Sequence, residues 1–321
     1  MSGILLAFTF HVGSYIWQFN QAGAGKVFYQ RTIKGRVALE GVGLHSGERT
    51  RVELCPAPPD TGVVFISRGI TIKASCGNIS DTAWATSLEK DGVKVGTIEH
   101  LLAALAALRV DNAYIEIEGP EVPVMDGSAL PFVKAIKGVG MEIQKTPRRY
   151  IKIVKEITVH DGDKSASVLP ATSSRLTARV DFGHPAISDR SLTVDLDPRT
   201  FERELAPSRT FGFLKDADML MKAGLAKGAT LDNAVVVGDD GVLNPGGLRF
   251  PDEFVRHKML DMVGDLSLLE MPLIGHIVGD KSGHALNRLL VHEILTRPES
   301  WIMVEGEAEM EETALAFAVG Q

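Results

Sequence analysis

The chain has 321 residues, of which 45% are hydrophobic and 23% charged, a composition typical of a globular protein of about two domains. The formal net charge of −7 argues against a nucleic-acid-binding surface, which requires a basic field. The two cysteines, Cys55 and Cys76, do not form a C-x-x-C pair, so neither a disulfide scaffold nor a thiolate zinc site is expected. This cysteine usage fits a reducing cytoplasm, and any bound metal should have nitrogen and oxygen ligands.

Residues 1–29 form an extension that we expect to lie outside the fold. Residues 1–25 contain no Asp, Glu, Lys or Arg, whereas a secretory signal carries positive side chains before its apolar core. Gln18, Asn20 and Gln21 interrupt the apolar stretch, which leaves it too short for a membrane-spanning helix. We therefore expect no stable membrane insertion.

Residues 30–145 have the pattern of a first α+β domain. Thr97 is placed to cap a helix over residues 98–108, which is apolar all round after its first turn and must therefore be buried. Asp91-Gly92 is a typical hairpin turn, and a second helix is expected over 132–137. Strands are expected within residues 36–47, 49–54, 62–67 and 112–118.

The basic, proline-containing segment 145–149 is expected to link this domain to a second one over residues 146–300. The order of elements then recurs, with strands, a helix from Asp252, a strand over 273–278 and a helix over 284–296. This shared order indicates a weak internal duplication, in which each half layers helices on a β-sheet and the halves pack face to face.

Two further segments stand apart from this repeated pattern. Residues 211–250 contain a helix over 214–222 and a strand over 233–238, so we expect a βαβ insertion in the second domain. Residues 301–321 are expected to form an acidic C-terminal tail.

The helix expected from Pro251 to Leu266 carries the main chemical signal. His257, Asp261 and Asp265 are four residues apart and therefore share one stripe of a helix. Apolar residues flank this stripe, so it lies near the core, where carboxylates need a positive partner. A divalent metal ion would satisfy them. The alternative is that the histidine and aspartates only hydrogen-bond each other and a nearby loop, which is ordinary at this spacing.

Other segments offer partners for such an ion. Glu99 and His100 diverge by about 100° on a helix, so a ligand His100 would leave Glu99 over a water held by the ion. Otherwise the pair is an ordinary helix start. His284 is either a surface residue at a helix start or a positively charged group held by Asp265. Thr210 is either a turn hydroxyl or a donor to an oxyanion.

Taken together, these segments resemble the bacterial UDP-3-O-acyl-N-acetylglucosamine deacetylases from about residue 30 to about residue 296. Several motifs in the same order carry the resemblance, which makes it specific. They are GVGLHSG at 41–47, TIEHL at 97–101, VMDGS at 124–128, RTFGF at 209–213, LRF at 248–250, the helix segment 254–265 and KSGH at 281–284.

The resemblance implies a β-α-α-β sandwich, in which paired helices lie between the sheets of two similar α+β domains. It also implies one Zn²⁺ bound by His100, His257 and Asp261. Two imidazoles and one carboxylate leave a coordination position open, as catalytic zinc sites do, whereas a structural zinc site is closed and usually holds thiolates.

The chemistry implied by the resemblance is metal-assisted amide hydrolysis. Glu99 is the expected base that activates water for attack on the acetamide carbonyl, and Thr210 the expected donor to the oxyanion. His284, kept protonated by Asp265, is expected to stabilise charge and to donate a proton to the departing amine, a step that Glu99 could also perform.

The resemblance also implies substrate contacts by Phe211 and Lys258, and an apolar tunnel for the acyl chain within the insertion. His45 and Asp126 match family motifs, but their chemistry assigns them no role beyond organising turns. The expected tunnel-lining residues are Leu214, Leu220, Leu231 and Val236.

The expected protein is therefore a cytoplasmic, monomeric zinc deacetylase that acts on UDP-3-O-acyl-N-acetylglucosamine in the committed step toward lipid A. One alternative is a different metal-dependent amidohydrolase on the same scaffold. Another is a metal-stabilised binding protein without turnover. Glu99 and His284 argue against the second alternative, because a passive site needs neither a base nor an acid.

Overall fold

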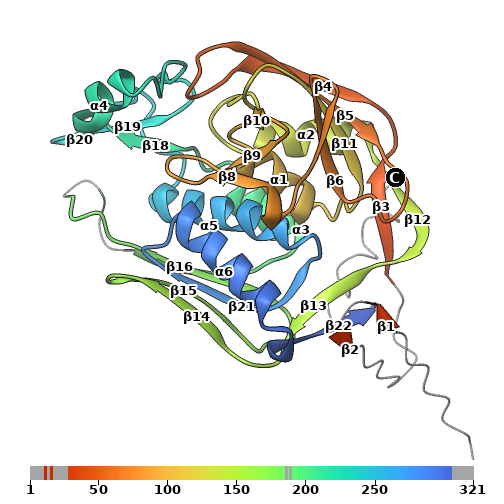
Figure 1. Cartoon of the computed structure of the whole chain (residues 1–321). Helices are drawn as coiled ribbons and strands as arrows, with labels where there is room; N and C mark the ends of the chain where they lie inside the picture. Colours follow the sequence, from red (N-terminus) through yellow and green to blue (C-terminus); the bar gives the residue numbers. More distant parts are fainter. Residues whose placement is uncertain (1–10, 13–14, 17–27, 185–186, 188–189, 306–321) are drawn as a thin grey trace, which may run out of the picture.

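The computed structural model describes residues 11–12, 15–16, 28–184, 187 and 190–305. Two α+β domains are stacked so that helices α1 (Glu99–Ala107) and α5 (Glu253–Leu266) lie between two β-sheets (Figure 1). The predicted β-α-α-β sandwich is therefore confirmed. Within the described residues, no helix has the length and apolar character needed to cross a membrane.

The N-terminal domain is built on a five-stranded sheet with a two-stranded sheet beside it. Its strands are β3 (Tyr29–Ile33), β4 (Val37–Val42), β5 (Arg49–Pro56), β6 (Val63–Ser67), β7 (Ile70–Lys73), β11 (Ala113–Glu118) and β12 (Met141–Pro147). The larger sheet has the order β4-β5-β11-β6-β7, in which only the β11–β6 pair is parallel. β3 pairs antiparallel with β12 and reaches the start of β11 through a parallel bridge between Thr32 and Asn112.

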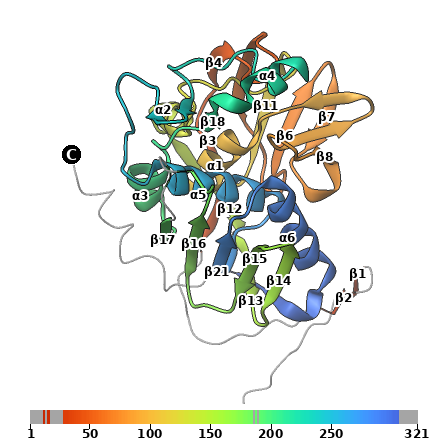
Figure 2. The same ribbon diagram turned by 90° about the vertical axis from the view of Figure 1, so that its left-hand side faces the viewer.

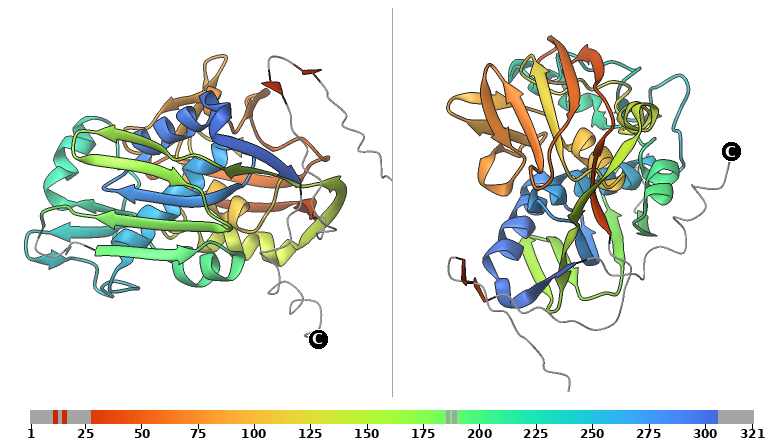
Figure 3. Two further views of the ribbon diagram at one scale, coloured as in Figure 1. Left: turned by 90° about the horizontal axis from the view of Figure 1, so that it is seen from below. Right: turned by 90° about the vertical axis from the view of Figure 1, so that its right-hand side faces the viewer.

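The C-terminal domain has a seven-stranded sheet, seen from its outer face in Figure 3. Its strands are β13 (Arg149–Ile153), β14 (Ile157–Asp161), β15 (Lys164–Leu169), β16 (Ser174–Val180), β17 (Arg190–Asp195), β21 (Leu273–Asp280) and β22 (Trp301–Glu305). The run β14-β15-β21-β16-β17 again contains one parallel pair, β21–β16. β13 pairs in parallel with the start of β21 and antiparallel with β22.

The two domains therefore match strand by strand in order and direction. β3 to β7 correspond to β13 to β17, β11 to β21 and β12 to β22. The helices correspond as well, because α1 and α2 (Leu130–Val139) flank β11 in sequence as α5 and α6 (His284–Thr296) flank β21. The predicted duplication thus extends to the complete topology of both halves.

Each half carries an insertion at the same point, between its fifth strand and its first helix. The first contains β8 (Ile79–Asp81), β9 (Ser87–Lys90) and β10 (Val93–Val95). The second contains α3 (Pro198–Thr200), a π-helical turn (Phe201–Leu205), β18 (Phe211–Phe213), α4 (Ala217–Lys222), β19 (Val235–Gly238) and β20 (Gly241–Val242). β18 is parallel to β19, so the predicted βαβ insertion is confirmed. Figure 2 shows α4 and β18 beside the N-terminal domain.

The sequence patterns explain why these elements pack in layers. Along β11, Ala113, Ile115 and Ile117 are buried while the alternate residues face outward, so one face of the sheet covers the helices. α1 is buried almost all round because it lies between its own sheet and α5. The two helices approach closely at Gly264, where an added Cβ would lie 2.1 Å from the carbonyl oxygen of Glu99.

The predicted cap of α1 is wrong. Thr97 makes no hydrogen bond that caps the helix, and Ile98 occupies the N-cap position. The Thr97 backbone has φ +53°, and its hydroxyl donates instead to Glu121 Oε1 at 2.6 Å. The hydroxyl therefore binds the loop that follows β11 and does not cap the helix.

Three expected domain limits also change. Residues 301–305 belong to the second sheet as β22, and Tyr29 already belongs to β3. The expected linker is occupied by the end of β12 and the start of β13, and Arg148 between them is buried with its Nε 2.7 Å from Asp111 Oδ1. Most of the expected N-terminal extension, and the tail from residue 306, lie outside the described residues.

Candidate active site

Three side chains from the facing helices form a compact group. His100 lies on the first turn of α1, while His257 and Asp261 lie one turn apart on α5. Their ligand atoms all lie within 4.8 Å of one another, and Asp261 Oδ1 is 3.2 Å from His257 Nε2 and 3.5 Å from His100 Nε2. All three residues are buried, and Asp261 Oδ1 has no hydrogen-bond partner among the described residues. A buried acceptor facing two imidazole nitrogens fits a cation.

The protonation of these groups also suits metal binding. Burial is the main cause that lowers the pKa of His257 to about 3, so this ring is neutral. Its Nδ1 lies 3.2 Å from the Ser208 carbonyl oxygen and donates to it, which leaves Nε2 with a lone pair toward Asp261. Burial favours protonated Asp261, but the positive charges that face it, that of His257 in its protonated form and that of Lys258, outweigh burial and hold the pKa of this carboxyl well below its usual range. Two imidazoles and a carboxylate form an open, thiolate-free donor set.

The Glu99 carboxylate lies buried beside this group. The Thr86 backbone N–H donates to Glu99 Oε2 at 3.0 Å, and Glu99 Oε1 is 3.9 Å from His284 Nε2. Burial raises the pKa of Glu99, and the neighbouring histidines His284 and His100 oppose that rise. The structure therefore provides a fixed carboxylate whose affinity for a proton is higher than usual.

His284 is the opposite case, an imidazole held in its charged form. It is only 8% exposed, so the reading of this residue as a surface helix start is wrong. Its Nδ1 lies 2.8 Å from Asp265 Oδ2. Burial alone would lower the pKa of His284, but the Asp265, Glu99 and Asp261 carboxylates outweigh it and raise that pKa to about 9. Its Nε2 faces Glu99 and Asp261, at 3.9 Å from an oxygen of each.

Two residues of this network were missed by the sequence interpretation. The Thr86 hydroxyl donates to Asp265 Oδ1 at 2.6 Å, and Asn287 Nδ2 donates to Asp265 Oδ2 at 2.8 Å. Asn287 lies three residues after His284 on α6, so helical spacing could have indicated it. Thr86 lies in the turn between β8 and β9, where no periodic pattern marks it.

The segment that leads into β18 of the second insertion is fixed against α5. The Arg209 guanidinium pairs with the buried Glu253 carboxylate, with 2.9 Å between Nε and Oε1, and the Arg209 backbone N–H donates to the same oxygen. The next residue, Thr210, is held by backbone hydrogen bonds to Gly127 and Val235, both 2.8 Å long. Thr210 is thus placed on a rigid segment next to the helix that carries His257.

Phe211 and Lys258 also lie at the metal group. The Phe211 ring packs edge-on against His257 and Phe254, with centroid separations of 6.1 and 4.9 Å. Lys258 Nζ lies 5.5 Å from the centre of the Phe211 ring and donates to Asp261 Oδ2 at 2.9 Å. The structure therefore brings both expected substrate-contacting residues next to the expected ligands.

The four expected tunnel residues lie on the outer parts of the insertion. Leu214 and Leu231 are 53% and 43% exposed, and Leu220 is part of the short helix α4. Val236 is half-buried, whereas its neighbours Val235 and Val237 are fully packed in a small apolar cluster with Phe254. Val236 therefore faces away from that cluster. The tunnel itself remains a prediction.

His45 and Asp126 secure turns that meet the second insertion. Asp126 Oδ2 accepts from Arg249 at 2.9 Å, and its other oxygen accepts from the Ser128 hydroxyl at 2.7 Å. The His45 backbone N–H donates to Glu121 Oε1 at 2.9 Å, and its carbonyl oxygen accepts from the backbone N–H of Lys227. Asp126 thus organises its turn through its side chain, whereas these contacts of His45 are made by its backbone.

Comparison with known proteins adds a second line of evidence. The family model described as UDP-3-O-acyl N-acetylglycosamine deacetylase matches residues 30–296. A protein of Myxococcus xanthus is 47% identical over 296 residues, covering 91% of this chain and 94% of its own length. Proteins of Syntrophotalea carbinolica and Pseudomonas entomophila are each 46% identical, covering 88% and 86% of this chain and 93% of their own lengths. All three are named UDP-3-O-acyl-N-acetylglucosamine deacetylase.

Proposed function

Because the chain belongs to the UDP-3-O-acyl N-acetylglycosamine deacetylase family, we propose that it hydrolyses the N-acetyl group of UDP-3-O-(3-hydroxyacyl)-N-acetylglucosamine. The products are acetate and the free amine, in the committed step of lipid A biosynthesis. The observation that carries the proposal is the buried His100, His257 and Asp261 group with Glu99 and a charged His284 directly beside it.

The proposed metal is Zn²⁺, held by His100, His257 and Asp261. When bound, Zn²⁺ supplies a Lewis acid that polarises a carbonyl group and lowers the pKa of water. The donor set supports this choice, because two imidazoles and one carboxylate with an open position are typical of catalytic zinc sites. Lys258 neutralises the second oxygen of Asp261, which leaves Oδ1 facing the two imidazoles.

Glu99 is the proposed general base. It takes a proton from the attacking water while the water oxygen forms a bond to the acetamide carbonyl carbon. Its raised pKa suits this step, because a base works best when its pKa lies near the operating pH. The Thr86 backbone N–H holds Glu99 Oε2 and so leaves Oε1 for the water.

His284 is the proposed proton donor to the sugar nitrogen as the carbon–nitrogen bond breaks. Asp265 orients its Nδ1 and keeps the ring charged, so Nε2 carries the proton on the side of Glu99. The Thr210 hydroxyl is proposed to donate to the oxyanion that develops on the acetamide oxygen. Its fixed backbone supports this role, because a preorganised donor needs no rearrangement during the reaction.

The remaining substrate contacts belong to the same proposal. Phe211 and Lys258 are proposed to contact the sugar nucleotide, supported by their position at the metal group. The second insertion is proposed to hold the acyl chain along Leu214, Leu220, Leu231 and Val236. A cytoplasmic location is supported by Cys55 and Cys76, which are both free thiols. A monomer is proposed because one chain supplies every group of the site.

The experiment combines metal analysis with an acetate-release assay on UDP-3-O-(3-hydroxyacyl)-N-acetylglucosamine. The wild-type protein is expected to contain one zinc ion and to release acetate. Glu99→Gln is expected to keep the zinc and to lose about 10²- to 10⁴-fold in kcat, the usual contribution of a general base. Glu118→Gln, on an exposed side chain of β11, is the matched control. An unchanged kcat in Glu99→Gln would contradict the base assignment, and a zinc-loaded wild-type protein without turnover would contradict the function.

A further inference from the structure

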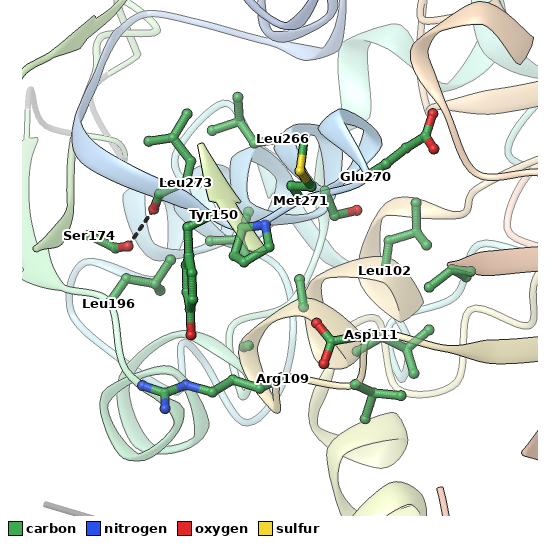
Figure 4. A pocket seen from close by; sticks show the side chains of 18 of the residues that line it. Leu102, Arg109, Asp111, Tyr150, Ser174, Leu196, Leu266, Glu270, Met271 and Leu273 are labelled. Atoms are coloured by element: carbon green, nitrogen blue, oxygen red, sulfur yellow. Dashed lines mark hydrogen bonds between the residues drawn. The ribbon is translucent and has the colours of Figure 1, made fainter. Parts of the chain in front are cut away.

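A cavity lies between the domains beside helices α1 and α5 (Figure 4). It has a volume of about 160 Å³ and is lined by Leu102 and Leu105 of α1 and by Leu266 near the end of α5. Leu196 and Met271 close it from the C-terminal domain. The cavity is separate from the metal group, because His100, His257 and Asp261 do not line it.

One polar group in this wall stands out. The Tyr150 side chain points into the cavity in Figure 4, and the residue is 8% exposed. Its ring packs on the Arg148 guanidinium at 5.4 Å, and its hydroxyl makes no hydrogen bond to another described residue. This hydroxyl is not one of the fully buried atoms that lack a partner, so it is free to hydrogen-bond a molecule in the cavity. By contrast, the nearby Ser174 hydroxyl donates to the Leu273 carbonyl oxygen at 2.5 Å.

The charged side chains of the wall are already matched in sign. They interact in three pairs, Arg148 with Asp111, Lys73 with Glu270, and Arg109 with Asp197. Three positive and three negative groups leave the wall without net charge. A charged ligand would lose its hydration here without gaining an opposite charge of its own. A neutral ligand does not meet that penalty.

We propose that this interdomain cavity binds a small neutral molecule, about the size of one aromatic ring, that carries a hydroxyl or carbonyl group. Its apolar body fills the space between α1 and α5, and its polar group hydrogen-bonds the Tyr150 hydroxyl. The size follows from the volume, because an apolar cavity of about 150 Å³ accommodates benzene. The polar group follows from Tyr150, which supplies one hydrogen-bonding group to a wall that otherwise contains several leucines.

Phenol is the probe, added to the zinc-loaded, full-length protein and measured by calorimetric titration. The expected result is saturable binding of one phenol per chain. Methionine methyl NMR locates the phenol, because Met271 lines the cavity whereas Met219 and Met221 lie on α4 of the second insertion. The Met271 signal is expected to shift with phenol while those of Met219 and Met221 stay in place. The opposite pattern would place phenol on the insertion and overturn the proposal.

The contribution of the hydroxyl is tested by Tyr150→Phe, with Tyr114→Phe on β11 as the matched control. A net hydrogen bond corresponds to roughly a two- to tenfold change in affinity. Tyr150→Phe is therefore expected to weaken phenol binding by that factor and to leave toluene binding unchanged, while Tyr114→Phe changes neither. Equal weakening of phenol and toluene would refute the hydrogen bond.

A filling variant keeps the test decisive if Tyr150→Phe does not fold. Leu196→Phe adds volume at the partly exposed edge of the cavity and is expected to abolish binding of both phenol and toluene. Its thermal transition and acetate release show whether the rest of the protein is intact. Unchanged phenol affinity in an intact Leu196→Phe protein, or no saturable phenol binding by the wild type, would show that the cavity is not the binding site.

Discussion

The two halves of this protein share one frame but not one chemistry. α1 and α5 occupy equivalent places, each leading into the central strand of its sheet. α1 carries polar chemistry only on its first turn, at Glu99 and His100, and is otherwise apolar. α5 carries a stripe of His257, Asp261 and Asp265 along its length. The candidate site exists only where these two helices face each other, so neither half contains it alone.

The two insertions also occupy equivalent places but contribute different residues. Both enter at the connection between the fifth strand and the first helix, and both deliver residues to the site. The first supplies Thr86, which binds Glu99 of its own half and Asp265 of the other. The second supplies Phe211, whose ring contacts His257, and Thr210 immediately before it. A repeated scaffold therefore fixes where chemistry can be placed, while the unequal insertions determine which residues arrive there.

The largest effect is expected from breaking the α5 stripe. His257→Ala and Asp261→Ala each remove a proposed ligand, so we expect loss of the zinc together with at least a roughly thousandfold loss of kcat/KM, since metal catalysis supplies several kcal/mol. Asp265→Asn, one turn further along α5, is expected to keep the zinc. Metal analysis and acetate release measure both outcomes. Full zinc content in Asp261→Ala would remove this residue from the ligand set.

The next effect tests the contact between the two helices. In Gly264→Ala the new Cβ would lie 2.1 Å from the Glu99 carbonyl oxygen and 2.8 Å from its carbon, so one backbone must move. We expect a loss of about 1–3 kcal/mol in the free energy of unfolding, and lower turnover because Glu99 moves with α1. Gly138→Ala on α2 is the control, because its Cβ meets nothing within 4 Å and is expected to stabilise the protein by about 0.5 kcal/mol. If Gly264→Ala and Gly138→Ala changed the free energy of unfolding in urea equally, the close contact of α1 and α5 at Gly264 would not be needed for stability.

Local patterns allowed much of the frame to be predicted from sequence. α6 spans His284–Thr296 as expected, because a glycine and a regular apolar period mark its start and its length. β22 was missed although the duplication itself indicates it, because β12 follows α2 in the first half. Thr97 was misread because residue type suggested a cap, whereas the tertiary contact with Glu121 determines where its hydroxyl points.

In the candidate site, too, local features could be predicted from sequence and tertiary contacts could not. His257, Asp261 and Asp265 could be grouped from sequence, because helical spacing is a local property. Placing His100 beside them required the family resemblance, since no local pattern shows that α1 faces α5. Thr86 could not be found at all, because its bond to Asp265 joins residues 179 positions apart in the chain.

Substitution of Thr86, which contacts both halves, is expected to lower kcat by a smaller factor and to leave the zinc content nearly unchanged. Thr86→Val keeps the backbone N–H for Glu99 but removes the hydroxyl from Asp265 Oδ1, leaving a buried carboxylate oxygen with one partner fewer. We expect about a 10- to 100-fold loss of kcat, as for other groups that orient a site from outside it, with little change in zinc content. Thr86→Ser restores the hydroxyl and is expected to recover most of the activity. Equal losses in both variants would assign the effect to packing of the methyl group.

The smallest expected effect concerns a helix start that has no counterpart in the first half. α1 and α5 begin without a side-chain cap, but Asp197 caps α3 by accepting from the backbone N–H groups of Arg199 and Thr200 at 2.8 and 3.0 Å. Asp197→Ala should therefore cost about 1 kcal/mol of unfolding free energy, measured by urea denaturation at pH 7. Asp197→Asn retains an acceptor and should cost less.

The pH dependence of this difference follows from the same contacts. Burial alone would raise the pKa of Asp197, but the hydrogen bonds from Thr200 and Arg199 outweigh it and lower that pKa below its ordinary value. Because the pKa is lowered, folded Asp197 binds a proton less readily than unfolded Asp197 does. The stabilisation by ionised Asp197 is therefore fully present above its ordinary pKa, and it is lost as the pH falls through the pKa of the folded state. The gap between wild type and Asp197→Ala should therefore narrow below about pH 4. If the difference in unfolding free energy between wild type and Asp197→Ala stayed constant down to pH 3, the negative charge of Asp197 would not contribute. Asp197→Asn would then be as stable as the wild type.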